Sequence, residues 1–332
     1  MSTTLEAEPP PVESSAPHSS WFRQDSGVAK IAERIAHIVG GVCVLGLLLR
    51  LTFRDHIPRI AVVYYMTPLI VQSVSYFGIA AVFWWRRKIP WAELSVCLAV
   101  LCAGWWGSSC LFLKANPNEP SQVSVLLWNT QRGVHAWPKI AEFLRDHDAP
   151  IIGLVEAATI TAERPEFWIN EFTDRNVVTF PHQLAVITKA EVLSREHGEL
   201  HPGSFYGRVD LRWKQQVLTV FVVDIKSKAW GTHREAALKS LEELVGKVTE
   251  NPAIVMGDFN TPTDSVFFDS WRTTMRNSFE ESGQGHAATW PIPFPVLSLD
   301  QIWLVGDIHS VSTRHLAPRL SDHQVVVTKL AW

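Results

Sequence analysis

Residues 253–260 read Ala-Ile-Val-Met-Gly-Asp-Phe-Asn, an uncharged apolar run that leads into a polar turn. A short run such as Ala253–Gly257 is typical of a strand that is buried on both faces. Asp258 follows this run directly, and Asn260 lies two residues further on. We therefore expect a buried strand whose end presents a carboxylate and an amide.

The same arrangement recurs along the second half of the chain. Apolar runs typical of strands are bordered by further polar side chains: Asn129 after Val123–Trp128, Glu156 after Ile151–Val155, Asp300 before Gln301–Val305, and Asp322 with His323 before Gln324–Lys329. Side chains at the ends of neighbouring strands can converge on one edge of a sheet. Carboxylates and amides with one imidazole suit a hard divalent cation such as Mg²⁺ or Mn²⁺. Taken singly, each residue also fits a turn, a helix cap or a solvated strand end.

Further elements complete the expected architecture of the second half. Strands are expected at Leu184–Thr188, Tyr206–Arg212 and Val217–Val223, the last two as a hairpin. Helical spacing of apolar residues predicts a helix at Trp137–His147 and another after Glu235. Because strands outnumber helices and arrive in pairs between them, we expect an α/β (α+β) fold with a two-sheet β-sandwich flanked by helices.

The first part of the chain predicts a membrane anchor. Residues 1–30 begin with a Pro-, Ser- and Glu-rich stretch and are expected to be a disordered tail. Residues 31–114 are expected to hold three transmembrane helices, from the apolar runs Ile35–Phe53, Ile60–Trp85 and Leu94–Leu113. The first run also fits a buried or interfacial helix. Pro and Asn residues predict a linker at 115–121, followed by a soluble domain at 122–332.

The charges and cysteines favour one orientation for this anchor. Six basic side chains lie on the N-terminal side of the expected spans and four on the other side, which favours a cytoplasmic N-terminus. Three crossings then place residues 122–332 outside the cytoplasmic membrane. All four cysteines lie in the first 120 residues, so a cysteine nucleophile or a Cys-ligated zinc is excluded from the soluble domain.

The net charge also differs between the two parts. The chain of 332 residues carries a formal charge of −3, of which residues 1–120 contribute +2 and residues 121–332 contribute −5. An acidic domain disfavours strong sequence-independent binding to a polyanion.

Five short blocks of the soluble domain resemble the signature of the endonuclease/exonuclease/phosphatase superfamily. They occur in the family order, namely Leu126-Leu127-Trp128-Asn129, Gly153-Leu154-Val155-Glu156, Gly257-Asp258-Phe259-Asn260, Leu299-Asp300-Gln301-Ile302 and Ser321-Asp322-His323. Thr289-Trp290-Pro291 is similar to the membrane-anchored bacterial branch of that superfamily. The resemblance covers about residues 121–332.

This resemblance implies a role for each polar residue. Glu156 would be the main ligand of a Mg²⁺ or Mn²⁺ ion, with Asn129 and Asp322 near the metal or the phosphate. Asp258 would orient and deprotonate the attacking water, and Asn260 would hold a phosphate oxygen. His323 would donate to the phosphate, and Asp300 would fix its ring and favour its charged form.

One position departs from the family pattern. The family usually has a histidine at the end of the strand that corresponds to Val217–Val223, and here that position is Asp224. Asp224 could pair with Lys226 or Lys228 away from the site, or it could bind a second divalent ion. Arg208 fits either a contact to a substrate phosphate or a solvated strand face.

The sequence therefore supports two functions of different classes. The first is a membrane-anchored, Mg²⁺- or Mn²⁺-dependent phosphoester hydrolase, acting as a nuclease, phosphatase or phosphodiesterase. The second is a non-catalytic binding or scaffold module on a degenerate hydrolase fold, which the altered Asp224 position motivates. Expected partners are the lipid bilayer and a phosphoester in a nucleic acid, a lipid headgroup or a small molecule, and the acidic domain favours the last two. Nothing in the sequence requires an obligate protein partner.

Overall fold

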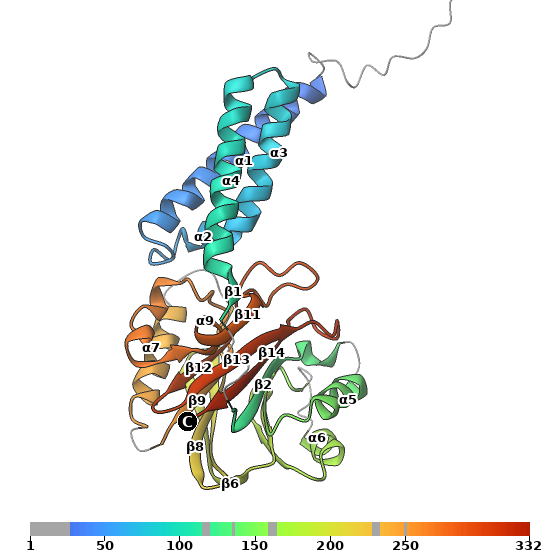
Figure 1. Ribbon diagram of the computed structural model, residues 1–332, viewed down its shortest axis with the longest axis vertical. Coiled ribbons are helices and arrows are strands. Elements are labelled where there is room, and N and C mark those ends of the chain that lie inside the picture. The colour runs from blue at the N-terminus through green and yellow to red at the C-terminus, as the bar shows by residue number, and fades with distance from the viewer. Residues whose placement is uncertain (1–26, 115–119, 135–136, 159–164, 228–232, 249–250) are drawn as a thin grey trace, which may run out of the picture.

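The chain forms a long helical bundle that is joined end-on to a domain of two β-sheets (Figure 1). The computed structural model describes residues 27–114, 120–134, 137–158, 165–227, 233–248 and 251–332. We call residues 27–110 the helical bundle and residues 111–332 the two-sheet domain. Most of the expected tail, residues 1–26, and of the expected linker, residues 115–119, lies outside the described residues.

Strand β2 (Val123–Asn129) shows why the sheets are covered on both faces. Successive side chains of a strand point to opposite faces of the sheet. Val125 and Leu127 pack into the core between the two sheets, whereas Leu126 and Trp128 pack under helices on the outer face. A strand that is apolar at every position is therefore buried on both sides.

The two sheets contain parallel and antiparallel pairs. The first sheet follows the order β1 (Leu111–Leu113), β11 (Gly283–His286), β13 (His309–Leu316), β14 (Val325–Ala331), β2, β3 (Ile151–Val155), β5 (Leu184–Thr188) and β4 (Asn176–Phe180). The second follows the order β10 (Arg276–Asn277), β12 (Asp300–Val305), β9 (Ala253–Asp258), β8 (Gln216–Asp224), β7 (Ser204–Trp213) and β6 (Glu191–His201). The pairs β2–β3 and β8–β9 are parallel.

Helices cover both outer faces of this sandwich (Figure 1). Helices α5 (Trp137–His147) and α6 (Pro165–Glu171) pack on the first sheet. Helix α7 (His233–Val245), the short turn η3 (Val266–Phe268) and helix α8 (Trp271–Thr274) pack on the second. The remaining short helices are η2 (Gln131–Gly133) and α9 (Ser278–Ser282). The expected two-sheet fold flanked by helices is confirmed.

The bundle contains α1 (Gly27–Leu51), α2 (Ala61–Met66), α3 (Leu69–Trp85) and α4 (Ile89–Cys110). Of the described helices, α1 and α4 are long and apolar enough to cross a membrane. The expectation of an unbroken second span, Ile60–Trp85, is wrong, because the chain leaves the helix at Thr67 and Pro68. Proline has no N–H to continue a helix. Helix α3 keeps 17 residues, and about 20 are needed to cross a hydrocarbon core without adjustment.

The end of the third expected span is also different. Residues Leu111–Leu113 are not helical but form strand β1, which pairs with β11 at the edge of the first sheet. Helix α4 ends at Cys110 and therefore leads directly into the two-sheet domain. The backbone carbonyl of Cys110 accepts a hydrogen bond from the Ala287 N–H at 2.9 Å.

Candidate active site

Three neighbouring strands of the second sheet bring three aspartates side by side. Asp258 of β9 is the register partner of Asp224 on β8 and of Asp300 on β12. A Cβ atom on Gly257 would collide with the carbonyl oxygen of Val223 on β8. Glycine at this position therefore allows the two strands to approach closely where their aspartates emerge.

Hydrogen bonds hold the Asp258 carboxylate in place. Its Oδ2 accepts from Nδ2 of Asn129 at 3.0 Å, and its Oδ1 accepts from the Asn260 N–H at 2.8 Å. Asn260 has φ of 46° and donates its own Nδ2 to the carbonyl of Ile225 at 2.8 Å. The left-handed turn at Asn260, which asparagine tolerates better than most residues, thus closes around Asp258.

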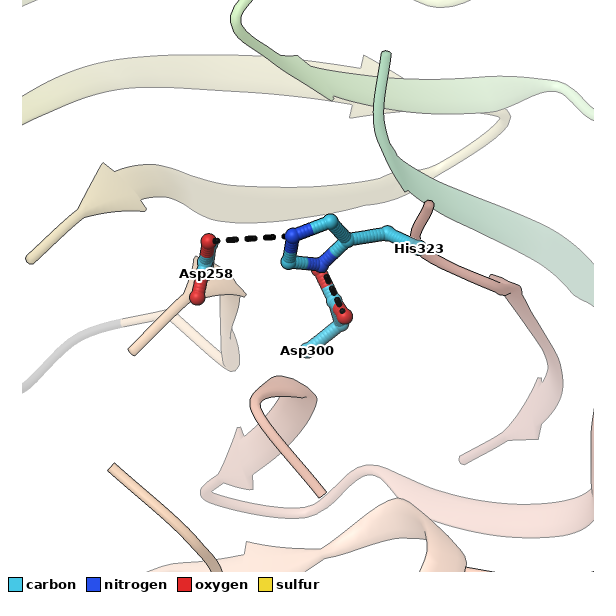
Figure 2. Close-up of side chains that lie close together, drawn as sticks. All are labelled: Asp258, Asp300 and His323. Carbon is cyan, nitrogen blue, oxygen red and sulfur yellow. Dashed lines mark hydrogen bonds and ion pairs between the residues drawn. The ribbon is translucent and has the colours of Figure 1, made fainter. Parts of the chain in front are cut away.

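His323 bridges two of these aspartates (Figure 2). Its Nδ1 donates to Oδ2 of Asp300 at 2.8 Å, and its Nε2 lies 3.9 Å from Oδ2 of Asp258. Burial would lower the pKa of His323, but the Asp300 charge and hydrogen bond, together with Asp258, raise it to about 10. The imidazole is therefore a cation at neutral pH, with Nε2 directed toward Asp258.

Glu156 reaches the site from the end of β3. Its backbone has φ of 54°, a conformation that is costly for residues other than glycine and that is found at functional sites. Its Oε1 lies 3.1 Å from Nη2 of Arg132. Burial raises the pKa of Glu156, and the Arg132 charge opposes that increase.

Burial and neighbouring carboxylates both disfavour the ionised forms of Asp258 and Asp224. Burial, followed by the charge of Asp300, raises the pKa of Asp258 to about 6. Burial, followed by the charges of Asp258 and Glu156, raises the pKa of Asp224 well above its usual range. A bound cation would relieve this repulsion.

A cavity of about 520 Å³ opens over these residues. We call it the site cavity. Six of the residues that we expected from the sequence line it, namely Asn129, Glu156, Asp224, Asp258, Asn260 and His323. Asp300 lies behind His323, to which it is hydrogen-bonded. Asp322 lies beside His323, with its Oδ1 4.0 Å from Nε2 of the imidazole. Oδ2 of Asp322 accepts a hydrogen bond from Nε1 of Trp290 at 3.1 Å.

Comparison with known proteins places this site in a family. A model of the endonuclease/exonuclease/phosphatase family matches residues 126–323, from the middle of β2 to His323. The chain belongs to the endonuclease/exonuclease/phosphatase family. No curated protein sequence matches the chain.

Solved structures of this family share the fold at low sequence identity. A mannosyl-6-phosphatase of Bacteroides thetaiotaomicron aligns with a TM-score of 0.52 and 15% identity, over 63% of this chain and 100% of its own. The catalytic domain of human Nocturnin with a bound sulfate anion aligns with a TM-score of 0.51 and 16% identity, over 63% of this chain and 94% of its own. The TDP2 protein of D. rerio, complexed with a single-strand DNA product, aligns with a TM-score of 0.51 and 12% identity, over 63% of this chain and 99% of its own. The fold is therefore shared with a phosphatase and with a protein that has been observed with a DNA product.

Enzymes of this family commonly use divalent metal ions, and the residues present here fit one. Asp258, Asp300 and His323 each offer a ligand atom within 4.8 Å of the others, although His323 could bind an ion only after losing its proton. Oδ1 of Asp300 and Oδ1 of Asp322 are buried and have no hydrogen-bond partner among the described residues. Buried carboxylate oxygens without donors, next to other carboxylates, are a suitable environment for a hard cation.

The structure does not bring Arg208 to the site. Arg208 is the register partner of Phe221, and its guanidinium lies over the Phe221 ring, which belongs to the outer-face core. It donates to Asp210 at 3.1 Å. Because side chains alternate along β7, Arg208 points to the outer face of the second sheet, away from the site cavity.

Sequence reasoning did not place cations or an apolar wall at the site cavity. Arg132, Lys226 and Arg234 line it, and so do three residues of α2, namely Val62, Tyr65 and Met66. The cations lie in turns or at a helix start, where periodicity carries no signal. Lys226 donates Nζ to the carbonyl of Pro202 at 3.3 Å, and the described residues show no ion pair between Lys226 and Asp224. Lys228 lies outside the described residues.

Proposed function

We propose that this protein is a membrane-anchored, divalent-metal-dependent phosphoester hydrolase. The observation that carries the proposal is the site cavity, in which six polar residues from separate strand ends and turns line one space of about 520 Å³. Cavities of this size accommodate small ligands or the headgroup of a larger one. The family to which the chain belongs includes phosphatases and nucleases, which supports the reaction class.

We assign the roles within this site as follows. Asp258 accepts the proton of the attacking water, whose oxygen bonds to phosphorus as the bond to the leaving oxygen breaks. His323, held by Asp300, donates from Nε2 to a phosphate oxygen, and Asn260 contacts another. Glu156, Asn129 and Asp322 would hold Mg²⁺ or Mn²⁺. Such an ion, when bound, neutralises phosphate charge and polarises the attacking water.

Activity of the full-length chain tests this proposal directly. Hydrolysis of a nitrophenyl phosphodiester and of nitrophenyl phosphate is measured with Mg²⁺, with Mn²⁺ and with a chelator. We expect metal-dependent turnover that falls by about 10²–10⁴-fold in Asp258→Asn, because the general base is lost. Asp307→Asn is the matched control, since Asp307 is exposed after β12. A folded wild-type chain without turnover would favour the alternative, a non-catalytic binding or scaffold module.

The bundle supports the membrane part of the proposal. The stretch between Arg34 and Arg50 of α1 has no charged side chain, and its 15 residues span about 22 Å. At one end Glu33 pairs with Arg86, and at the other Arg50 pairs with Asp264 of the two-sheet domain. Large apolar side chains such as Ile38 and Leu101 are exposed on the outside of the bundle. An extended apolar surface with charges at both ends suits a lipid bilayer.

Cysteine labelling tests the proposed multi-pass orientation, in which the two-sheet domain is extracytoplasmic. The four native cysteines are first replaced by alanine, which leaves a chain without thiols. In intact spheroplasts, Asp307→Cys should react with a membrane-impermeant maleimide, whereas Arg87→Cys, at the α3–α4 turn, should react only after lysis. The opposite pattern would show the opposite orientation. Equal reaction at both sites before lysis would contradict the proposal that the bundle spans a membrane.

A further inference from the structure

One wall of the site cavity comes from the helical bundle. Val62, Tyr65 and Met66 of α2 line the cavity together with the polar residues of the two-sheet domain. Met66 is the last residue of α2, and 69% of its surface is exposed. The cavity is therefore polar on the side of the sheets and apolar along α2.

Buried hydrogen bonds hold α2 against the two-sheet domain. Asp55, in the turn between α1 and α2, is 1% exposed. Its Oδ2 accepts from the Tyr65 hydroxyl at 2.7 Å and from Ser265 Oγ at 2.5 Å, and its Oδ1 accepts from the Val266 N–H at 2.9 Å. The Tyr64 hydroxyl also donates to the Asp264 carbonyl at 3.0 Å. The wall is thus a fixed part of the site.

A buried cation lies next to this apolar wall. The guanidinium of Arg234 lies 4.6 Å from the centre of the Tyr65 ring. Arg234 is 9% exposed, and its Nε has no hydrogen-bond partner among the described residues. Its Nη2 donates to the Ser227 carbonyl at 2.9 Å. Arg234 lines the site cavity, and a guanidinium at such a position is suited to bind a phosphate oxygen.

The apolar wall lies at the end of the bundle that meets the two-sheet domain (Figure 1). Helix α2 lies between the end of α1 and the start of α3, and exposed apolar side chains such as Leu51, Phe53 and Met66 occur at this end. If the bundle spans a bilayer, this end lies at the membrane surface on the side of the active site. A substrate that enters along α2 then comes from the lipid.

We infer that the site cavity takes a phosphoester that is carried by a membrane lipid. The phosphate lies among the polar residues, where Arg234 and Lys226 provide positive charge. The apolar chain of the lipid leaves along Val62 and Met66. This inference rests on the proposed hydrolase function and names its substrate class. A long nucleic acid fits less well, because α2 closes one side of the cavity and the two-sheet domain is acidic.

Paired substrates test the inference in nanodiscs of phosphatidylcholine that contain the full-length chain. Phosphatidylglycerol is compared with water-soluble glycerophosphoglycerol, and phosphatidic acid with glycerol phosphate. In at least one pair, kcat/KM for the membrane-borne ester should exceed that for its deacylated counterpart by about ten-fold or more, because the apolar chain gains contacts along α2. Met66→Ser should reduce this ratio by about ten-fold. Ile57→Ser, at an exposed apolar residue outside the cavity lining, should leave the ratio unchanged.

Other outcomes separate failure of the inference from failure of the function. Suppose that the chain hydrolyses the nitrophenyl phosphodiester. Equal rates within both lipid pairs, or no hydrolysis of any of the four paired esters, would then overturn the inference and leave the hydrolase function intact. A ratio that Met66→Ser leaves unchanged would also overturn it, as would hydrolysis of DNA or RNA faster than of either lipid. A chain that hydrolyses no phosphoester with Mg²⁺ or Mn²⁺ would refute the hydrolase and, with it, the lipid substrate.

Discussion

Asp224 and Asp258 are register partners at the ends of the parallel strands β8 and β9, where both side chains line the site cavity. Burial and the Asp258 charge raise the pKa of Asp224 well above its usual range. The described residues provide no ion pair for Asp224. This is also the position where the family resemblance implies a histidine. The site therefore has a carboxylate where the resemblance implies a phosphate-binding imidazole.

The first prediction concerns the role of this carboxylate. If Asp224 binds a second divalent ion, Asp224→Ala should lower kcat/KM and flatten the metal titration toward a single-site curve. Asp224→His should restore activity at a lower metal concentration, because an imidazole replaces the repelling charge by a phosphate donor. Turnover as a function of Mg²⁺ and Mn²⁺ concentration measures both effects. An unchanged kcat/KM and titration in Asp224→Ala would show that Asp224 has no part in the reaction.

The second prediction concerns the metal ligands. Glu156→Gln removes one negative charge from the proposed ligand set and leaves Arg132 without its partner. The metal concentration that gives half-maximal activity should rise by about 10–100-fold. Glu243→Gln, at an exposed position of α7, is the matched control. If the two titrations coincide, Glu156 does not hold the ion.

The third prediction concerns pH. Asp258 must be ionised to accept a proton, so kcat/KM should rise as the pH increases through about 6. His323 must be protonated to donate, so kcat/KM should fall as the pH increases through about 10. The Asp300 charge raises both pKa values. Asp300→Asn should therefore move both limbs of the profile to lower pH, the alkaline limb by roughly one unit or more.

The paired movement distinguishes positioning from general damage. A variant that is only less well folded would lose activity at every pH and keep both limbs in place. Profiles of kcat/KM at saturating metal, from wild type and from Asp300→Asn, provide the measurement. An alkaline limb that does not move would mean that Asp300 does not control the charge of His323.

Much of the site could be predicted because its residues lie at the ends of buried strands. An apolar run such as Ala253–Gly257 indicates a strand without knowledge of its neighbours, and the polar residue that ends it is visible in the same stretch. The polar strand Glu191–His201 has no such signal, since it is an exposed edge of the second sheet. Arg208 shows a different limit, because the face to which a strand residue points depends on the register of the whole sheet.

The role of α2 could not be predicted from local pattern. The run Ile60–Trp85 is uncharged throughout, and hydropathy does not distinguish the six residues of α2, three of which line the site cavity, from the seventeen of α3. Only Pro68 indicates the break between them. The contacts that place α2 join residues about 200 positions apart, as between Asp55 and Ser265. Sequence spacing contains no information on such pairs.

The fourth prediction concerns Asp55, whose carboxylate accepts two hydrogen bonds from the two-sheet domain and one from Tyr65 of α2. Asp55→Ala would leave the Val266 N–H and the hydroxyls of Tyr65 and Ser265 buried without this acceptor. Each unsatisfied group costs about 1–3 kcal/mol, so the loss of stability should be about 3 kcal/mol or more. The midpoint of heat unfolding in detergent, followed by tryptophan fluorescence, should fall accordingly. Asp307→Ala, at an exposed aspartate, should leave it in place.

Asp55→Asn separates hydrogen bonding from charge at the same position. The amide oxygen can still accept from the Val266 N–H, and the Tyr65 and Ser265 hydroxyls can rotate to accept from the new NH₂ group. We therefore expect the unfolding midpoint of Asp55→Asn to lie within a few degrees of that of wild type. Asp55→Asn should also keep the preference for a membrane-borne phosphoester. Asp55→Ala should lose that preference, because α2 separates from the cavity. If Asp55→Asn and Asp55→Ala are equally destabilised, the carboxylate acts through its charge. If neither is destabilised, α2 is held by other contacts.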